Sequence, residues 1–343
     1  MQNRRRFLKS SLALPLLASG GSILGALSTS TAQASGADDY KALVCVFLEG
    51  GMDGHDTLLP YDQTSYDAYT KLRAPLLEAY AMQPGGSSRE RTQLLPLSPA
   101  TPMAGGRELA LAPELGGLAD LFERGHCAVV ANTGPLVEPI VTEDYNHSPW
   151  KLPSRLFSHN DQRYQWMTFA PEGAQFGWPG RFGDSGLKAA SDSTFSQISL
   201  YGYPAFLNGE LVSPYQMSSR GVRQLWVPGI GLESERALIR EHLESLGSVR
   251  DNLFERDIVN ITRISLDAND RMALALELAS EPATPFPATP LGRQLETVAK
   301  IISARETLGL NRQVFMVGIR GFDTHAGQAA TLPVLQAEVD KAI

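Results

Sequence analysis

Two groups of residues in this sequence combine side chains that commonly bind metal ions. Asp53, His55 and Asp56 follow the glycines at positions 50 and 51, and Asp323 and His325 follow Gly321. Carboxylates bind hard cations, and carboxylates together with imidazoles bind zinc. Residues two apart in an extended segment point to the same side, so Asp323 and His325 can face one ion. The alternative for both groups is an ordinary polar turn.

An apolar run precedes each of these groups. Residues 43–48 and 314–317 are continuous apolar segments, which predicts strands covered on both faces, as in a parallel sheet. Ligands of open α/β sheets bind in the crevice beyond the carboxyl ends of the strands. We therefore expect the two groups to converge on one divalent metal site, with zinc, manganese, magnesium or calcium as the ion.

A third segment with chemical potential begins at Ser158, which is followed by His159 and Asp161. A serine followed three residues later by an acid is typical of a helix start, where the serine caps the first turn. A helix N-terminus is also an anion site, where a serine hydroxyl can meet a phosphoryl or sulfuryl group. The sequence alone leaves both interpretations open.

The remaining pattern alternates helices and strands, which predicts an α/β fold. Helical spacing is present in 115–124, 250–280 with a break near Asn269, 291–308 and 332–343. Further strands are predicted at 127–131, as a second buried strand, and at 195–201. Irregular excursions from the sheet are expected near 62–106 and 203–285.

The first 34 residues predict an export signal. Three consecutive arginines at positions 4–6 precede an apolar segment at about 10–27 and a small-residue cleavage site, Ala32-Gln33-Ala34. This order is typical of the twin-arginine route, which exports folded proteins, and the alternative is a short membrane-anchoring N-terminus. We expect the twin-arginine export machinery as a partner, and a periplasmic or extracellular location.

The composition after residue 34 excludes several classes of partner. Residues 1–34 hold four basic and no acidic residues, which leaves 26 Lys and Arg against 37 Asp and Glu, a formal net charge of −11. Such a charge disfavours nucleic acid and anionic membrane surfaces. No later stretch reaches the roughly 18 apolar residues of a membrane span. Cys45 and Cys127 each lie in an apolar run, which favours small core residues over a disulfide.

Several motifs, taken in order, resemble one exported bacterial family. They are the twin-arginine leader, FLEGGMDGHDTLLP, LALAPELGGLADLFERGHCAVVANTGPL, LFSHNDQ, GWPGRFGD and LGLNRQVFMVGIRGFDTHAGQ. Together they resemble the domain of unknown function fifteen-oh-one family, which is grouped with the alkaline phosphatase-like superfamily. The resemblance extends from about residue 43 to the end.

This resemblance implies an α/β fold with a central, largely parallel sheet sandwiched by helices, in one domain over 35–343. It implies divalent metals, usually two, beyond the strand ends, and hydrolysis of small anionic phosphate or sulfate esters. The first-strand ligand falls on Asp53 or Asp56, with Asp53 preferred, and further ligands fall on Asp323 and His325. Ser158 is the nucleophile candidate, and His159 is a further ligand or an acid/base candidate.

One part of the expected pattern is absent from this sequence. The superfamily completes its metal site with a later Asp-His pair, and the family has segments resembling SEFGR and TDHG, neither of which occurs before Ile343. We therefore expect a C-terminally incomplete α/β domain. The expected function is that of an exported metal-dependent hydrolase. The alternative is an exported, non-catalytic binding or assembly protein that retains the fold.

Overall fold

A computed structural model describes residues 40–83, 88–170, 172–186, 193–202, 204–222, 237–238, 241–242, 245 and 252–343. Residues 40–343 form one compact unit. The predicted export signal over residues 1–34 lies outside the described residues. Within the described part of the chain, no helix has both the length and the apolar character needed to cross a membrane.

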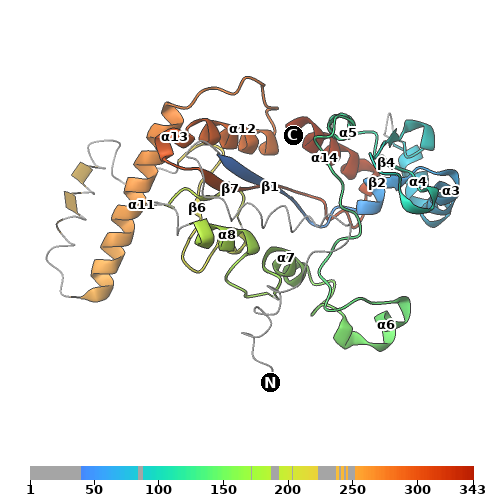
Figure 1. Ribbon diagram of the computed structural model, residues 1–343, viewed down its shortest axis with the longest axis horizontal. Helices are drawn as coiled ribbons and strands as arrows, with labels where there is room; N and C mark the ends of the chain where they lie inside the picture. The colour runs from blue at the N-terminus through green and yellow to red at the C-terminus, as the bar shows by residue number, and fades with distance from the viewer. Residues whose placement is uncertain are drawn as a thin grey trace. The chain divides into compact units, whose positions relative to one another are not determined.

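A parallel sheet forms the centre of the fold (Figure 1). Its strand order is β1 (Lys41–Glu49), β7 (Arg312–Arg320), β5 (Gln197–Ser199) and β6 (Tyr215–Gln216), and each neighbouring pair is parallel. The strands predicted at 43–48, 314–317 and 195–201 are thereby confirmed. β1 and β7 pair along their full lengths, so their carboxyl ends lie side by side.

One face of the sheet packs against α7 (His159–Thr168), α8 (Trp178–Gly186) and α9 (Pro204–Leu207). Alternate residues point to opposite faces of a strand, and the set on this side contributes Cys45, Phe47, Val314 and Met316. Met167 of α7 and Phe206 of α9 are fully buried against them. Burial raises the pKa of the Cys45 thiol to about 11, and Cys45 and Cys127 are both free.

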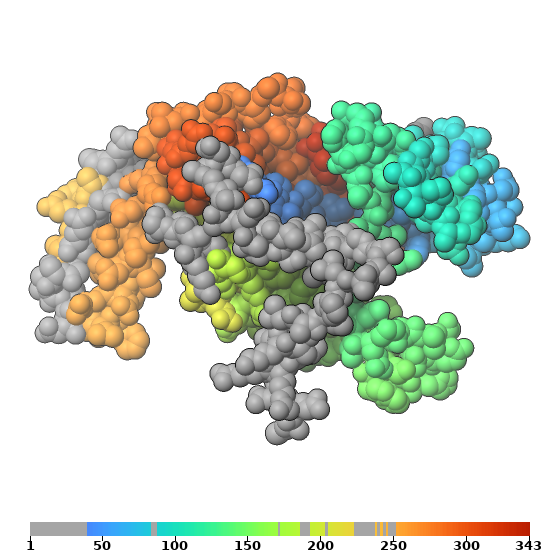
Figure 2. Space-filling view, viewed as in Figure 1, coloured from blue at the N-terminus to red at the C-terminus, as the bar shows by residue number. Residues whose placement is uncertain are grey.

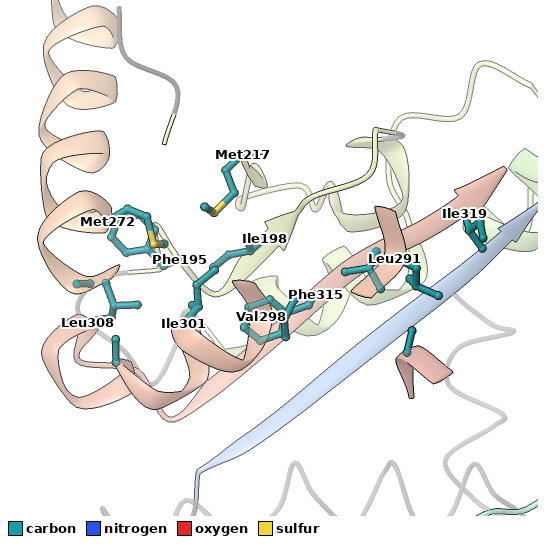
Figure 3. Close-up of a cluster of buried hydrophobic side chains, with 14 of the residues drawn as sticks. Phe195, Ile198, Met217, Met272, Leu291, Val298, Ile301, Leu308, Phe315 and Ile319 are labelled. Atoms are coloured by element: carbon teal, nitrogen blue, oxygen red, sulfur yellow. The ribbon is translucent and has the colours of Figure 1, made fainter. Parts of the chain in front are cut away.

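The opposite face carries the largest apolar cluster (Figure 3). Phe315, Val317 and Ile319 of β7 pack there against α12 (Pro290–Ser303), and α11 (Leu253–Glu277), α13 (Arg305–Leu308) and α14 (Gln328–Ala342) complete the layer. Helices therefore cover both faces of the sheet. This confirms a mixed α/β fold with a parallel sheet between helices.

The segment expected to leave the sheet forms a lobe with a core of its own, around Leu59, Tyr69 and Ala110. An antiparallel sheet in the order β2-β4-β3 carries this core. In Figure 2 the green surface of α5 lies beside the red surface of α14, which α5 contacts. The lobe consists of β2 (Leu58–Pro60), α3 (Gln63–Leu72), α4 (Ala74–Ala81), β3 (Leu95–Pro96), β4 (Leu109–Leu111) and α5 (Gly116–Glu123).

Short helical elements occupy several connections. They are η2 (Gly54–Asp56), η3 (Arg91–Gln93), η4 (Ala104–Gly106), α6 (Thr142–His147) and η5 (Pro149–Lys151).

Two sequence predictions about elements are wrong. Residues 127–131 form no strand, because no described strand lies beside them to accept their hydrogen bonds, and Val129 and Val130 are 42% and 55% exposed. Helix α11 runs unbroken through Asn269, because a single asparagine disfavours a helix interior only weakly. The Asn269 side chain accepts a hydrogen bond from the Tyr215 hydroxyl at 2.8 Å. β1 packs on both faces as predicted, but it is only partly buried.

Candidate metal centre at the strand ends

Three exposed side chains converge where β1 and β7 end. His159 is the first residue of α7, and Asp323 and His325 follow β7. One ligand atom from each of the three lies within 4.8 Å of the other two. The Asp323 carboxylate is in the middle, with Oδ1 2.8 Å from Nε2 of His325 and Oδ2 3.7 Å from Nε2 of His159. We call these three residues the histidine–aspartate cluster.

Glycine at position 50 lets the loop after β7 approach the end of β1. Gly50 has φ of 116°, and a Cβ atom there would lie 2.3 Å from the backbone nitrogen of Asp323. The neighbouring Phe322 N–H donates to the Glu49 carbonyl oxygen at 3.1 Å, which continues the strand pairing. Any side chain at position 50 would therefore displace Asp323, because the contact is with backbone.

His159 is presented by a capped helix start. The Ser158 hydroxyl oxygen accepts from the Asp161 backbone N–H, and the hydroxyl donates to Oδ2 of Asp161 at 2.8 Å. This hydrogen bond helps to hold the pKa of Asp161 below its usual range. The structure thus confirms the capping role of Ser158, whose role as nucleophile stays a prediction. His159 follows the cap directly and joins the cluster.

The donor set of the cluster suits a transition metal. Two imidazoles and a carboxylate are the ligands of several catalytic zinc sites, and three protein ligands leave coordination positions for water or substrate. Manganese and iron accept the same set, whereas calcium and magnesium prefer oxygen ligands alone. The residues therefore fit zinc or a similar ion better than the calcium or magnesium that the sequence also allowed.

Asp53 lies outside the cluster and forms an ion pair. Both of its carboxylate oxygens accept from the Arg73 guanidinium, at 2.6 and 3.1 Å, and Gln328 donates to it at 2.9 Å. Burial alone would raise the pKa of Asp53, but these hydrogen bonds outweigh it and lower the pKa. Gln328 also accepts from the Thr324 hydroxyl at 3.0 Å, so Asp53 is connected to the loop that carries Asp323 and His325.

Asp56 is fully buried in a hydrogen-bond network that meets Asp53 at Gln328, which donates to both carboxylates. Its carboxylate accepts from the Tyr69 hydroxyl at 3.0 Å, the Tyr80 hydroxyl at 2.5 Å and Nε of Arg89 at 3.1 Å. Arg89 is itself buried and also pairs with Glu114 at 3.0 Å. Burial acts to lower the pKa of Arg89, but the combined attraction of Asp56, Tyr80 and Glu114 outweighs burial and raises it. We call Asp56, Tyr69, Tyr80 and Arg89 the buried aspartate network.

Apart from Ser158, the residues predicted for metal binding or catalysis therefore divide into two groups. The structure brings His159, Asp323 and His325 together, and it places Asp53 and Asp56 among donors of their own. Sequence reasoning missed Gln328, the residue that links the two groups. Its only signal was its position at the end of the glycine-rich segment after β7.

The fold and the site define a mixed α/β protein with a histidine–aspartate cluster at the carboxyl ends of parallel strands. A family model described as a protein of unknown function, DUF1501, matches residues 40–343, and the chain belongs to this family. No curated protein and no solved structure matches the chain.

Proposed function

We propose that this protein is a metal-dependent hydrolase of phosphate or sulfate esters, of the alkaline phosphatase-like type and exported by the twin-arginine route. The observation that carries the proposal is the approach of His159, Asp323 and His325 to within 4.8 Å of one another. Their place beyond the ends of parallel strands supports it, because ligands of α/β folds bind there. The exposure of the cluster supports access by a substrate.

A bound metal ion would polarise an ester oxygen and neutralise charge that develops on it. The chain's own residues would hold that ion through the Nε2 atoms of the two histidines and the Asp323 carboxylate. Ser158 lies next to His159, and its hydroxyl donates to Oδ2 of Asp161. If Ser158 attacks the ester, its oxygen would bond to the phosphorus or sulfur, the ester's alkoxide would leave and take a proton from solvent, and the hydroxyl proton would pass to Oδ2 of Asp161.

Asp323→Ala tests the proposal directly. We expect loss of both metal uptake and turnover, measured by elemental analysis and by assays on phosphomonoester, phosphodiester and sulfate ester substrates. Asp340→Asn is the matched control, since Asp340 is a carboxylate whose contacts are the backbone N–H groups of Gly117 and Leu118. Unchanged metal content in Asp323→Ala would contradict the proposal. Metal binding without turnover on this panel favours the non-catalytic binding or assembly protein.

Ser158→Ala separates catalysis from metal binding. We expect this variant to keep its metal and to lose turnover, with about 1 kcal/mol of stability lost through the missing helix cap. Retained turnover would assign Ser158 to capping alone. Metal content and activity are measured on the same preparation, so the result does not depend on how much folded protein each variant yields.

A further inference from the structure

Glu49, the last residue of β1, gathers three polar side chains around its carboxylate. Oε1 accepts from Nη1 of Arg163 at 2.8 Å. Oε2 accepts from the Tyr201 hydroxyl at 2.5 Å and lies 2.9 Å from Nε of Arg320. The Glu49 side chain is only 15% exposed. A carboxylate so enclosed by donors is held in one orientation.

Glu49 touches both of the elements that carry the histidine–aspartate cluster. Its backbone carbonyl accepts from the N–H of Phe322, the residue before Asp323. Its carboxylate pairs with Arg163, which lies four residues after His159 on α7. Residues four apart lie on the same side of a helix, so the ion pair acts on the turn next to His159.

The rest of α7 is anchored by apolar contacts near its other end. The Trp166 ring lies 5.5 Å from the Phe47 ring, and Met167 is buried between α7 and the sheet. These contacts hold the helix on the sheet but act beyond Arg163. Within the first turn, the Ser158 cap and the Glu172 N–H hold Asp161, and Arg163, which also donates to the Asn160 side chain, ties the turn to the end of β1.

We infer that Glu49 is a positioning residue for the metal centre, which acts through Arg163 to bring His159 to Asp323 and His325. This inference rests on the proposed metal centre. Without the Glu49 charge, the first turn of α7 loses its ionic link to the strand ends, and His159 loses its fixed distance from Asp323. Residues that orient metal ligands in this way typically contribute 10–100-fold to metal affinity.

A double-mutant cycle with Co²⁺ as the probe tests the inference. Co²⁺ affinity and the visible absorption spectrum are measured for the full chain as wild type, Glu49→Gln, His159→Ala and the double variant. We expect Glu49→Gln to bind Co²⁺ about 10-fold or more weakly, with a spectrum like that of His159→Ala. We also expect the double variant to bind Co²⁺ as tightly as His159→Ala alone, because Glu49 acts through His159.

Three further variants serve as references. Arg163→Gln should reproduce the loss, and Arg163→Lys should recover part of it, because lysine keeps the charge but not the forked geometry. Asp340→Asn should bind Co²⁺ like the wild type, since it alters a carboxylate of α14 that accepts hydrogen bonds from the backbone of α5. Circular dichroism on each sample confirms that folded molecules are being compared.

The outcomes distinguish this inference from the proposed function. Two results would overturn the positioning role and leave the metal centre intact. One is that Glu49→Gln binds Co²⁺ as tightly as the wild type. The other is that Glu49→Gln weakens Co²⁺ binding by the same factor in the His159→Ala background as in the wild type. Absence of Co²⁺ binding by the wild type overturns both.

Discussion

Asp56 and Asp323 both follow an apolar strand and a glycine, yet they have opposite surroundings. Asp56 is 0% exposed, and two hydroxyls and a guanidinium donate to it. Asp323 is exposed and lies beside two imidazoles, whose nitrogens can bind the same cation that a carboxylate binds. The neighbouring side chains, rather than the aspartate itself, therefore determine which reactions or ligands each carboxylate can take part in. Donors satisfy the charge of Asp56, whereas the imidazoles beside Asp323 leave its carboxylate free to act as a ligand in the proposed metal centre.

The largest effect is expected in the buried aspartate network. Arg89→Ala leaves Asp56 and Glu114 without their buried cation, so we expect a loss of about 3–5 kcal/mol of unfolding free energy, measured by urea denaturation. Arg124→Ala is the control, because the Arg124–Asp120 pair is exposed and should change stability by about 0.5 kcal/mol or less. A loss below about 1 kcal/mol for Arg89→Ala would show that the network is not the stabilising element described above.

A second variant tests the cluster through its backbone. Gly50→Ala forces Cβ against Asp323 and strains a positive φ, so we expect about 2–3 kcal/mol of destabilisation and weaker metal binding. Gly51→Ala is a close control, because Gly51 also has a positive φ but has no heavy atom within 4 Å of its Cβ position. Its cost should be about 1 kcal/mol, with unchanged metal affinity. Equal metal affinities in the two variants would contradict the close-approach argument.

The third prediction concerns acid stability. The folded pKa of Asp53 is lowered, so its contribution to stability is complete above the unfolded pKa of about 3.9 and is lost as pH falls through the folded pKa. Asp53→Asn should therefore cost about 1 kcal/mol at pH 7 and much less at acid pH, measured by denaturation at several pH values. A cost that does not change with pH would assign the effect to geometry instead of charge.

The smallest effect on the metal-free protein is expected at the cluster itself. His325→Ala alters an exposed side chain, so unfolding free energy without metal should change by about 0.5 kcal/mol or less. Added Zn²⁺ should raise the melting temperature of the wild type, because a ligand that binds only the folded state stabilises it. His325→Ala should show little of this increase. An equal increase in both proteins would place the Zn²⁺ elsewhere.

Elements with local signals were predictable from the sequence. The apolar runs at 43–48 and 314–317 became β1 and β7, and the helix over 291–308 became α12 and α13. The strand predicted at 127–131 was wrong because a strand also needs a neighbouring strand, and local composition does not show whether one is present. Asn269 suggested a helix break, and its partner Tyr215 is 54 residues away.

The site, like the fold, was predictable only where the signal is local in sequence. Asp323 and His325 are close in sequence and were expected to face one ion, whereas His159 was a candidate only through the family resemblance, and the structure places it beside them. The environment of Asp56 was not predictable, because Tyr69, Tyr80 and Arg89 lie 13 to 33 residues further along the chain. No local pattern marks them as its donors.

The pairing of β1 with β7 also determines the order in which this molecule can fold. Tyr40, just before β1, donates its hydroxyl to Gln313 of β7 across 273 residues of sequence. During synthesis β1 emerges long before the strand beside it exists, and such non-local parallel pairing forms slowly. The apolar 43–48 segment therefore stays unpaired in the nascent chain until β7 has been synthesised. β1 therefore needs protection from aggregation until β7 has been made.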